Sequence, residues 1–253
     1  MKPKKSLFSR NGQAAAFVTA VTFCVAGHSF AADYDWNAGA ADFNTPSNWS
    51  IGGSPAAGVP GTTDTANVAN GGNAQWTTNT AKTVSELRAG NGAAGAISIS
   101  GGSTFATGNA LVGRQSGAAA GTLTVSGAGT IFNLTTGNTH VGTVSHTFGT
   151  AGAGATGVLN ITSGAVYNHT PNGDESFIIG NNSPAVANGP LQAGTYKGTL
   201  NVDNATLNVL NGSRLYIAQS AGSVGEVNVT NNGIINVTDD WLIVGRGGSG
   251  KLT

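Results

Sequence analysis

The chain has 253 residues, of which 40 are glycine and only 9% are charged, with 11 basic residues against 11 acidic ones. Charged residues normally make up about a quarter of a soluble domain, and glycine disfavours helix interiors, so this composition excludes an ordinary helical domain. It is not the composition of a disordered chain either, because Leu, Ile and Val recur in register instead of being scattered.

The first 31 residues predict a cleaved signal peptide. An uncharged apolar stretch covers residues 14–26, and small residues at Ser29 and Ala31 indicate cleavage after Ala31. The stretch is too short for a membrane span, which needs roughly 20 residues. The alternative is a retained amphipathic anchor. The basic residues at the start of this segment are Lys2, Lys4, Lys5 and Arg10.

The remaining chain, residues 32–253, contains no cysteine, because the only one is Cys24 in the signal segment. Exported eukaryotic domains often depend on disulfides, so their absence favours a bacterial source. Four of the 11 basic residues lie in the signal segment, which leaves seven against 11 acidic residues and a formal charge of −4. This charge argues against a nucleic-acid partner, whose binding depends on neutralising phosphates.

Residues 32–94 are expected to form an N-terminal cap and a degenerate first repeat. Their large aromatic side chains suit a cap, because the end of a repeat stack needs a cover. Val84 and Leu87 indicate the degenerate repeat. The aromatic residues of the predicted cap are Trp36, Phe43, Trp49 and Trp76.

Residues 95–253 contain internal repeats, each of which opens on a glycine followed by alternating aliphatic residues. Three short strand-like pieces make up a repeat, and clusters of Gly, Asn and Ser separate them, as tight corners with positive φ require. One repeat cannot bury its own aliphatic residues, but stacked repeats place Leu on Leu and Val on Val. The opening glycines are Gly95, Gly121, Gly157, Gly198, Gly225 and Gly250.

This pattern predicts an all-β fold in which the repeats stack in parallel as a β-helix, or β-solenoid. The alternative is an antiparallel β-sandwich or barrel. Asn160, Asn201 and Asn228 lie between the aliphatic positions, so we expect an outward-facing ladder of hydrogen-bonded amides. No second cap is recognised at the far end, and we expect the chain to be a fragment of a longer protein. The first aliphatic column is Ile97, Leu123, Leu159, Leu200 and Val227.

The Gly-x-Leu-x-Val unit that closes with Val-Gly or Ile-Gly resembles a repeat of autotransporter (type V secretion) passengers and of PEP-CTERM-sorted exported proteins. The segment Trp36…Asn48-Trp49-Ser50…Gly58-Val59-Pro60-Gly61…Asp64-Thr65-Ala66 is similar to the Trp-rich opening that often precedes such repeats. The resemblance covers most of residues 33–253. It implies a right-handed parallel β-helix at the bacterial cell surface, often adhesive or structural. It also implies that any membrane attachment depends on a missing C-terminal part, either an outer-membrane barrel or a sorting tail.

The acidic residues of the repeats are spread over different units, which argues against the clustered acids of a polysaccharide lyase. Asp239 and Asp240 are adjacent, so in a strand they point to opposite faces and chelate poorly. His140 is expected in a third strand piece, and His146 and His169 in loops, without metal-ligand partners. We therefore expect no catalytic residue, no metal and no cofactor.

Two insertions at the same junction of consecutive repeats, residues 143–156 and 181–197, are candidates for recognition, because solenoids carry binding loops on one side. Tyr196, Lys197 and Trp241 are the candidate contact residues, with a surface glycan or a protein of a host or neighbouring cell as partner. The sequence thus predicts a non-catalytic, exported, structural or adhesive surface protein. The alternative is a carbohydrate-active β-helix, either a lyase or a glycan-binding module, and a third possibility is self-stacking into a surface layer.

Overall fold

The structure is a computed structural model that describes residues 31–114, 119–143, 154–171, 175–182 and 194–253. The predicted signal peptide and most of both predicted insertions lie outside these residues. Within them the fold is nearly all β, with one short 3-10 turn and no α-helix. No described helix has the length and apolar character needed to cross a membrane.

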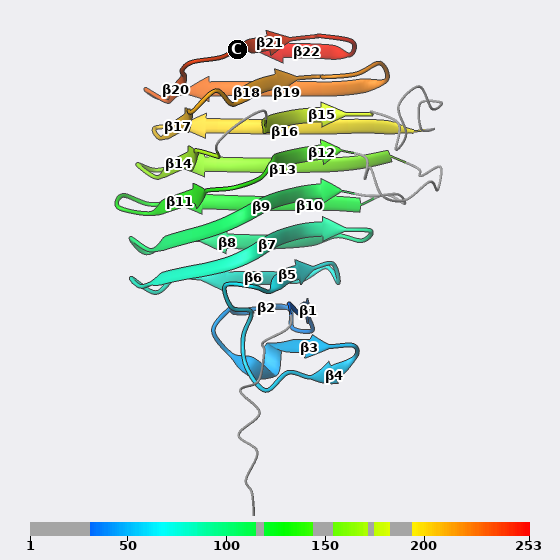
Figure 1. Ribbon diagram of the computed structural model, residues 1–253, viewed down its shortest axis with the longest axis vertical. Coiled ribbons are helices and arrows are strands. Elements are labelled where there is room, and N and C mark those ends of the chain that lie inside the picture. Colours follow the sequence, from blue (N-terminus) through cyan, green and yellow to red (C-terminus); the bar gives the residue numbers. More distant parts are fainter. Residues whose placement is uncertain (1–30, 115–118, 144–153, 172–174, 183–193) are drawn as a thin grey trace, which may run out of the picture.

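The strands form two large sheets, of 14 and eight strands. The eight-stranded sheet takes the first piece of each repeat and lies along the whole stack (Figure 1). Its strands, in spatial order, are β2 (Ala40–Asp42), β6 (Asn73–Trp76), β8 (Gly95–Ile99), β10 (Ala119–Ser126), β13 (Gly154–Thr162), β16 (Thr195–Asp203), β19 (Ser223–Thr230) and β22 (Ser249–Leu252).

The 14-stranded sheet takes the second and third pieces. Its main path contains β5 (Thr65–Val68), β7 (Ala81–Asn91), β9 (Thr104–Arg114), β11 (Ile131–Leu134), β14 (Val166–His169), β17 (Thr206–Val209) and β20 (Ile234–Val237). A branch from β9 contains β12 (Thr139–Thr143), β15 (Ser176–Asn181), β18 (Arg214–Ile217) and β21 (Leu242–Val244). At its first end lie β1 (Asp33–Trp36), β3 (Trp49–Ile51) and β4 (Ser54–Pro55), with the 3-10 turn η1 (Pro46–Asn48).

Successive repeats pair in parallel and in the predicted register. Leu123 lies opposite Ile97 on one side and Leu159 on the other, and Leu159 in turn lies opposite Leu200. Among the described strands, antiparallel pairing occurs only where β3 meets β1 and β4. The prediction of an all-β fold with parallel sheets is therefore confirmed, and the antiparallel alternative is wrong for the repeats.

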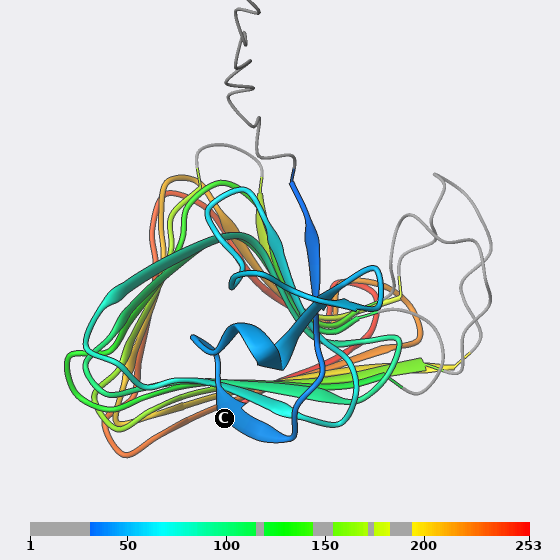
Figure 2. The same ribbon diagram turned by 90° about the horizontal axis from the view of Figure 1, so that it is seen from below.

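The interior is a continuous cluster of buried apolar side chains. Seen from below, the strands of successive layers lie over one another (Figure 2). The most regular part of the cluster is a stack of aromatic rings from successive layers. The rings of Phe105 and Phe132 stack with centroids 5.8 Å apart, and the rings of Phe132 and Tyr167 with centroids 4.6 Å apart. Parallel in-register pairing places these residues above one another, and burial of such large rings is a major source of stability.

Glycine opens each repeat because two parts of the backbone nearly touch there. A Cβ at Gly157 would lie 2.2 Å from the carbonyl oxygen of Val112 and 2.3 Å from the backbone nitrogen of Gly142. Gly142 itself has φ of +65°, a conformation that favours glycine. The recurrent Val-Gly and Gly-x-Leu elements of the sequence are thus the two sides of one close backbone contact.

The predicted amide ladder is present on the outer face of the eight-stranded sheet. The Nδ2 of Asn201 donates to Oδ1 of Asn160 (2.8 Å), and the Nδ2 of Asn228 donates to Oδ1 of Asn201 (3.0 Å). A second ladder, which the sequence analysis missed, follows the 14-stranded sheet with distances of 2.8–2.9 Å. Its members are Asn133, Asn168, Asn208 and Asn236.

The aromatic residues of the predicted cap form a buried cluster. Trp49 is fully buried and its indole Nε1 donates to the carbonyl oxygen of Phe43 (2.8 Å). The rings of Trp36 and Phe43 each meet the Trp49 ring edge-on, with centroids 4.8 Å away. Parallel stacking already begins within residues 32–94, because Trp76 of β6 pairs with Ile99 of β8.

Candidate functional site

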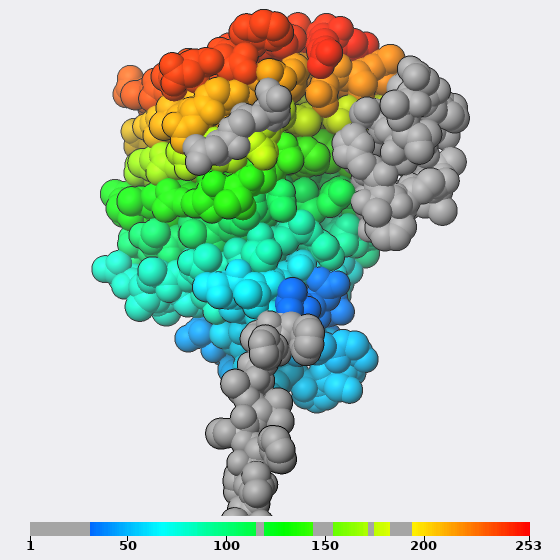
Figure 3. Space-filling model, in the orientation of Figure 1, coloured from blue at the N-terminus to red at the C-terminus, as the bar shows by residue number. Residues whose placement is uncertain are grey.

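The two ends of the stack expose different surfaces. The residues predicted as a cap, which include β1, β3 and β4, lie at one end, and the other end is formed by β20, β21 and β22 (Figures 1 and 3). We call these three strands, with the residues between them, the open end. Of the large hydrophobic residues that are exposed in the described part of the chain, all but Ile51 of the cap lie at the open end. They are Ile234, Trp241, Leu242, Val244 and Leu252.

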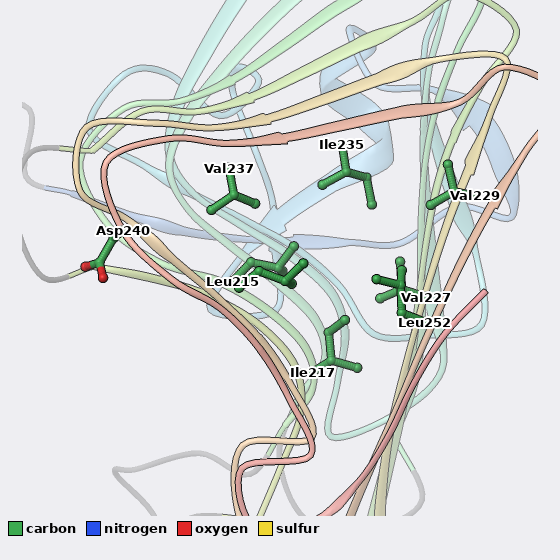
Figure 4. Close-up of a pocket in the computed structure, with 9 residues that line it drawn as sticks. Leu215, Ile217, Val227, Val229, Ile235, Val237, Asp240 and Leu252 are labelled. Atoms are coloured by element: carbon green, nitrogen blue, oxygen red, sulfur yellow. The ribbon is translucent and has the colours of Figure 1, made fainter.

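A cavity of about 460 Å³ lies in the open end (Figure 4). Aliphatic side chains of β18, β19 and β20 point into it, together with Leu252 of β22, and Asp240 lies at its rim. In the inner layers the corresponding positions are covered by the next repeat. Leu200, for example, is covered by Val227. The cavity is thus lined by core positions. The inward residues of the three strands are Leu215, Ile217, Val227, Val229, Ile235 and Val237.

Trp241 stands beside this cavity and is 65% exposed. The guanidinium of Arg214 lies 5.8 Å from the centre of its ring, and the same guanidinium donates through Nε to Oδ2 of Asp240 (2.9 Å). A cation over an indole ring and a paired carboxylate hold the three side chains together. Trp241 is therefore exposed, and its role as a contact residue stays a prediction.

Lys197 also faces outward, on the eight-stranded sheet. Its Nζ lies 3.9 Å from the carboxylate of Glu226, which lies 3.7 Å from Nζ of Lys251 in the following strand. The three side chains form a row of alternating charge, and each exposed pair contributes at most about 1 kcal/mol. Glu226 thus pairs with both lysines on the sheet surface, and the side chains of Lys197 and Lys251 remain exposed.

Tyr196 does not present its side chain to a partner, which corrects the expectation for this residue. It is fully buried and packs with Ala119 and Ala155 in a small cluster beside the main core. Burial raises the pKa of its phenol, whose oxygen has no hydrogen-bond partner among the described residues. The intervening insertion residues, 144–153 and 183–193, lie outside the described part of the chain.

Two acidic residues of the repeats, Asp203 and Asp240, make contacts at the protein surface. Asp240 pairs with Arg214, and Asp203 accepts hydrogen bonds from Thr230 (2.9 Å) and Asn231 (2.6 Å). Among the described residues no three His, Cys, Asp or Glu side chains lie close enough together to hold a metal ion.

His169 is a core residue of β14 and not a loop residue, which corrects a second expectation. Its Nδ1 lies 3.1 Å from Oγ1 of Thr139, and that hydroxyl lies 2.8 Å from the phenol of Tyr167. The opposite nitrogen, Nε2, is buried and has no hydrogen-bond partner in the described part of the chain. Desolvation lowers the pKa of His169 from 6.5 to about 3, so the imidazole is neutral at physiological pH. The group is sealed from solvent and has no access to a substrate.

Comparisons with known proteins give no identification. No protein family, no curated protein and no solved structure is significantly matched by this chain. The resemblance to autotransporter passengers and PEP-CTERM-sorted proteins therefore stays a prediction from the repeat motif.

Proposed function

We propose that this chain is an exported, non-catalytic surface protein, structural or adhesive, whose repeats wind into a right-handed parallel β-solenoid with a Trp-containing cap. The observation that carries the proposal is the in-register pairing of like residues from Ile97 to Val227 along one sheet. Right-handed connection of parallel strands is the rule in proteins, which supports the proposed hand. A rod of this kind extends a surface away from the cell without needing an active site.

Two further features support display outside the cytoplasm. Residues 1–31 have the composition of a signal peptide, and the chain after them has no cysteine. A location at the bacterial cell surface or in the medium agrees with both features.

Expression of all 253 residues in a Gram-negative host tests the export part of this proposal. We expect the signal segment to be removed after Ala31 and cell fractionation to find the product outside the cytoplasm. Phe17→Asp, which interrupts the apolar stretch, should retain the unprocessed chain inside the cell, whereas Asn11→Asp, outside that stretch, should be exported normally. A cytoplasmic product with an intact N-terminus in the unaltered chain would contradict the proposal.

Glycan binding is the second candidate function, and one observation favours it. Trp241 is exposed and its neighbours Arg214 and Asp240 supply hydrogen-bonding groups, a combination that suits stacking against a sugar ring. Binding of the protein to immobilised polysaccharides should then weaken on Trp241→Ala and be unaffected by Ile51→Ala. If no polysaccharide is retained, or if both variants bind alike, glycan binding at Trp241 is wrong. The lyase alternative has no comparable observation in its favour.

A further inference from the structure

Asp64 is the one buried acidic residue in the described part of the chain, with 7% of its surface exposed. It lies immediately before β5, and each of its carboxylate oxygens accepts a hydrogen bond from the backbone. Oδ2 accepts from the nitrogen of Gly61 (2.8 Å), three residues away in the same turn. Oδ1 accepts from the nitrogen of Ala32 (3.0 Å), which is 32 residues away. A buried carboxylate therefore holds the segment that leads into β1.

Ala32 is fixed at both its nitrogen and its carbonyl group. Its nitrogen donates to Asp64, and its carbonyl oxygen accepts from the nitrogen of Thr65 (2.9 Å). β1 begins at the next residue, and its parallel pairing with β5 starts with Asp33 opposite Thr65 (Figure 1). Ala31, by contrast, is exposed. The chain thus passes from solvent into the folded sheet between Ala31 and Ala32.

The bond between Ala31 and Ala32 is also the bond at which the signal peptide is predicted to be cut. Hydrolysis breaks this C–N bond and places the hydroxyl of a water molecule on the carbonyl carbon of Ala31. The nitrogen of Ala32 takes one proton from that water and a second from solvent. A neutral amide N–H becomes a primary ammonium group, with three N–H donors and a positive charge at neutral pH.

We propose that Asp64 binds the α-ammonium group of Ala32 in the processed protein, so that signal-peptide removal converts a backbone hydrogen bond into an ion pair. The inference rests on the proposed export, with cleavage after Ala31. The present distance of 3.0 Å already suits such a contact. A hydrogen bond between charged groups is about twice as strong as one between neutral groups. β1 is therefore held more firmly against β5 in the processed protein than in the precursor.

The other titratable side chains near Asp64 do not supply this charge. In the described part of the chain no lysine or arginine forms an ion pair with Asp64. Lys82 of β7 places its Nζ over two aromatic rings of the predicted cap, 5.7 and 5.9 Å from their centres. Tyr34 of β1 is neutral at physiological pH, because burial and the charge of Asp64 both raise the pKa of its phenol. A buried carboxylate is costly without a cation, and the ammonium group of Ala32 provides one.

The α-amino group of the exported protein gives the direct readout. All 253 residues are expressed with export, and mass spectrometry establishes that the product begins at Ala32. Competitive acylation over a range of pH, with the N-terminal peptide quantified, then gives the pKa of the α-amino group. Because a nearby carboxylate stabilises the ammonium form, we expect this pKa to be raised above its ordinary value. At pH 7 the amine should be acylated about tenfold more slowly than in Asp64→Asn.

Two carboxylate variants distinguish the ion pair from a general effect of charge. In Asp64→Asn the pH profile of acylation should move to lower pH by about one pH unit, because the carboxylate is lost. Asp33→Asn is the matched control. It removes the same charge next to Ala32 in the sequence, but the side chain of Asp33 is 68% exposed, so acylation should change by less than about twofold. Near-ultraviolet circular dichroism, which reports the packed aromatic rings, establishes that each variant is folded.

An insertion moves the terminus and leaves Asp64 unaltered. With Gly-Ser inserted between Ala31 and Ala32, the product begins two residues earlier and the nitrogen of Ala32 stays an amide. The pKa of the new α-amino group should then have its ordinary value, and the Tm should fall by about 2–4 °C. In Asp64→Asn the same insertion should leave the Tm unchanged, because there is no ion pair to lose.

The proposal is overturned if the acylation profiles of the unaltered protein and Asp64→Asn coincide, if Asp33→Asn has the same effect as Asp64→Asn, or if the insertion alters neither pKa nor Tm. A product that begins at another residue also overturns it, because Ala32 then carries no ammonium group. Retention of the intact chain in the cytoplasm contradicts the export proposal itself. A product that begins at Ala32 with an ordinary α-amino pKa contradicts only the role of Asp64.

Discussion

The Nδ2 of Asn201 donates to Oδ1 of Asn160 over 2.8 Å, and the two residues occupy the same position of consecutive repeats. Asn201 also accepts from Asn228, so it makes two ladder hydrogen bonds. In parallel strands such bonds run along the stack and fix which residues lie opposite each other. The amide ladder is therefore a source of register as well as of stability.

Asn201→Ala should lower the free energy of unfolding by about 1–2 kcal/mol, because two hydrogen bonds are lost and two amide groups lose a partner. Asn236→Ala, which removes a single ladder bond at an exposed edge, should cost about half as much. Urea unfolding monitored by circular dichroism gives both values. Equal losses in the two variants would show that the interior ladder position has no special role.

The close backbone contact at the start of each repeat predicts a strict requirement for glycine. In Gly157→Ala the new Cβ would lie 2.2 Å from the oxygen of Val112, which is backbone and cannot move aside. We expect a loss of about 3 kcal/mol or more, or failure to fold. Gly58→Ala is the matched control, because no atom lies within 4 Å of its Cβ position and its φ is not positive. Thermal unfolding that is equally affected in both variants would contradict the prediction.

Ala218 breaks the glycine pattern and predicts a stabilising substitution. It has φ of +59° at the position where other repeats have Gly142 or Gly180. A left-handed conformation costs a residue with a Cβ roughly 1 kcal/mol, so Ala218→Gly should raise the free energy of unfolding by up to about 1 kcal/mol. Differential scanning calorimetry would detect a higher Tm. A lower Tm would show that the Ala218 methyl group contributes more through packing than its φ costs.

Much of this architecture was predictable because like residues align. The columns through Leu123, Leu159 and Leu200 and the ladder through Asn160 follow from period-2 alternation alone. The second ladder is harder to predict because its members lie near the ends of short strands, where Asn is also typical of turns. Asn133 and Asn168 directly follow the buried Phe132 and Tyr167, so the same alternation places them outward.

The errors at Tyr196 and His169 share one cause. Each side chain was placed by the segment next to it, an insertion for Tyr196 and a presumed loop for His169. The alternation of inward and outward positions along the strand was not used. Tyr196 precedes Leu200 by four residues, and His169 follows Tyr167 by two, so alternation places both side chains inward. The cavity of the open end could not be derived from parity, because its volume depends on which neighbouring strands are present.

The buried His169 predicts a specific loss of stability in acid. Its pKa falls from 6.5 to about 3 in the folded protein, so the unfolded chain binds its proton more tightly. The stability that depends on neutral His169 is therefore complete above about pH 6.5 and falls as the pH decreases towards 3, by at most about 1.4 kcal/mol per pH unit. In His169→Leu, which resembles the Leu134 and Val209 of adjacent layers, this part of the pH dependence should disappear.

The measurement compares urea unfolding of the unaltered chain and of His169→Leu at pH 7 and at pH 4.5. The difference in unfolding free energy between the two proteins should change by about 2–3 kcal/mol over this interval, to the advantage of the variant at low pH. Carboxylates titrate in both proteins alike and cancel. A difference that is independent of pH would show that His169 is protonated, or hydrated, in the folded protein.

The central claim, that consecutive repeats lie in parallel and in register, is tested most directly by cysteine cross-linking, because the chain after residue 31 has no cysteine of its own. Val158 and Thr199 are direct partners in neighbouring strands and face outward. A chain with Val158→Cys and Thr199→Cys should form an intramolecular disulfide readily on mild oxidation, because directly paired positions lie within about 7 Å of each other. Val158→Cys with Asn201→Cys places the second cysteine on the same face but two residues out of register, and should cross-link far more slowly. Equal rates for the two pairs, or faster cross-linking of the second, would contradict the stacking of these repeats.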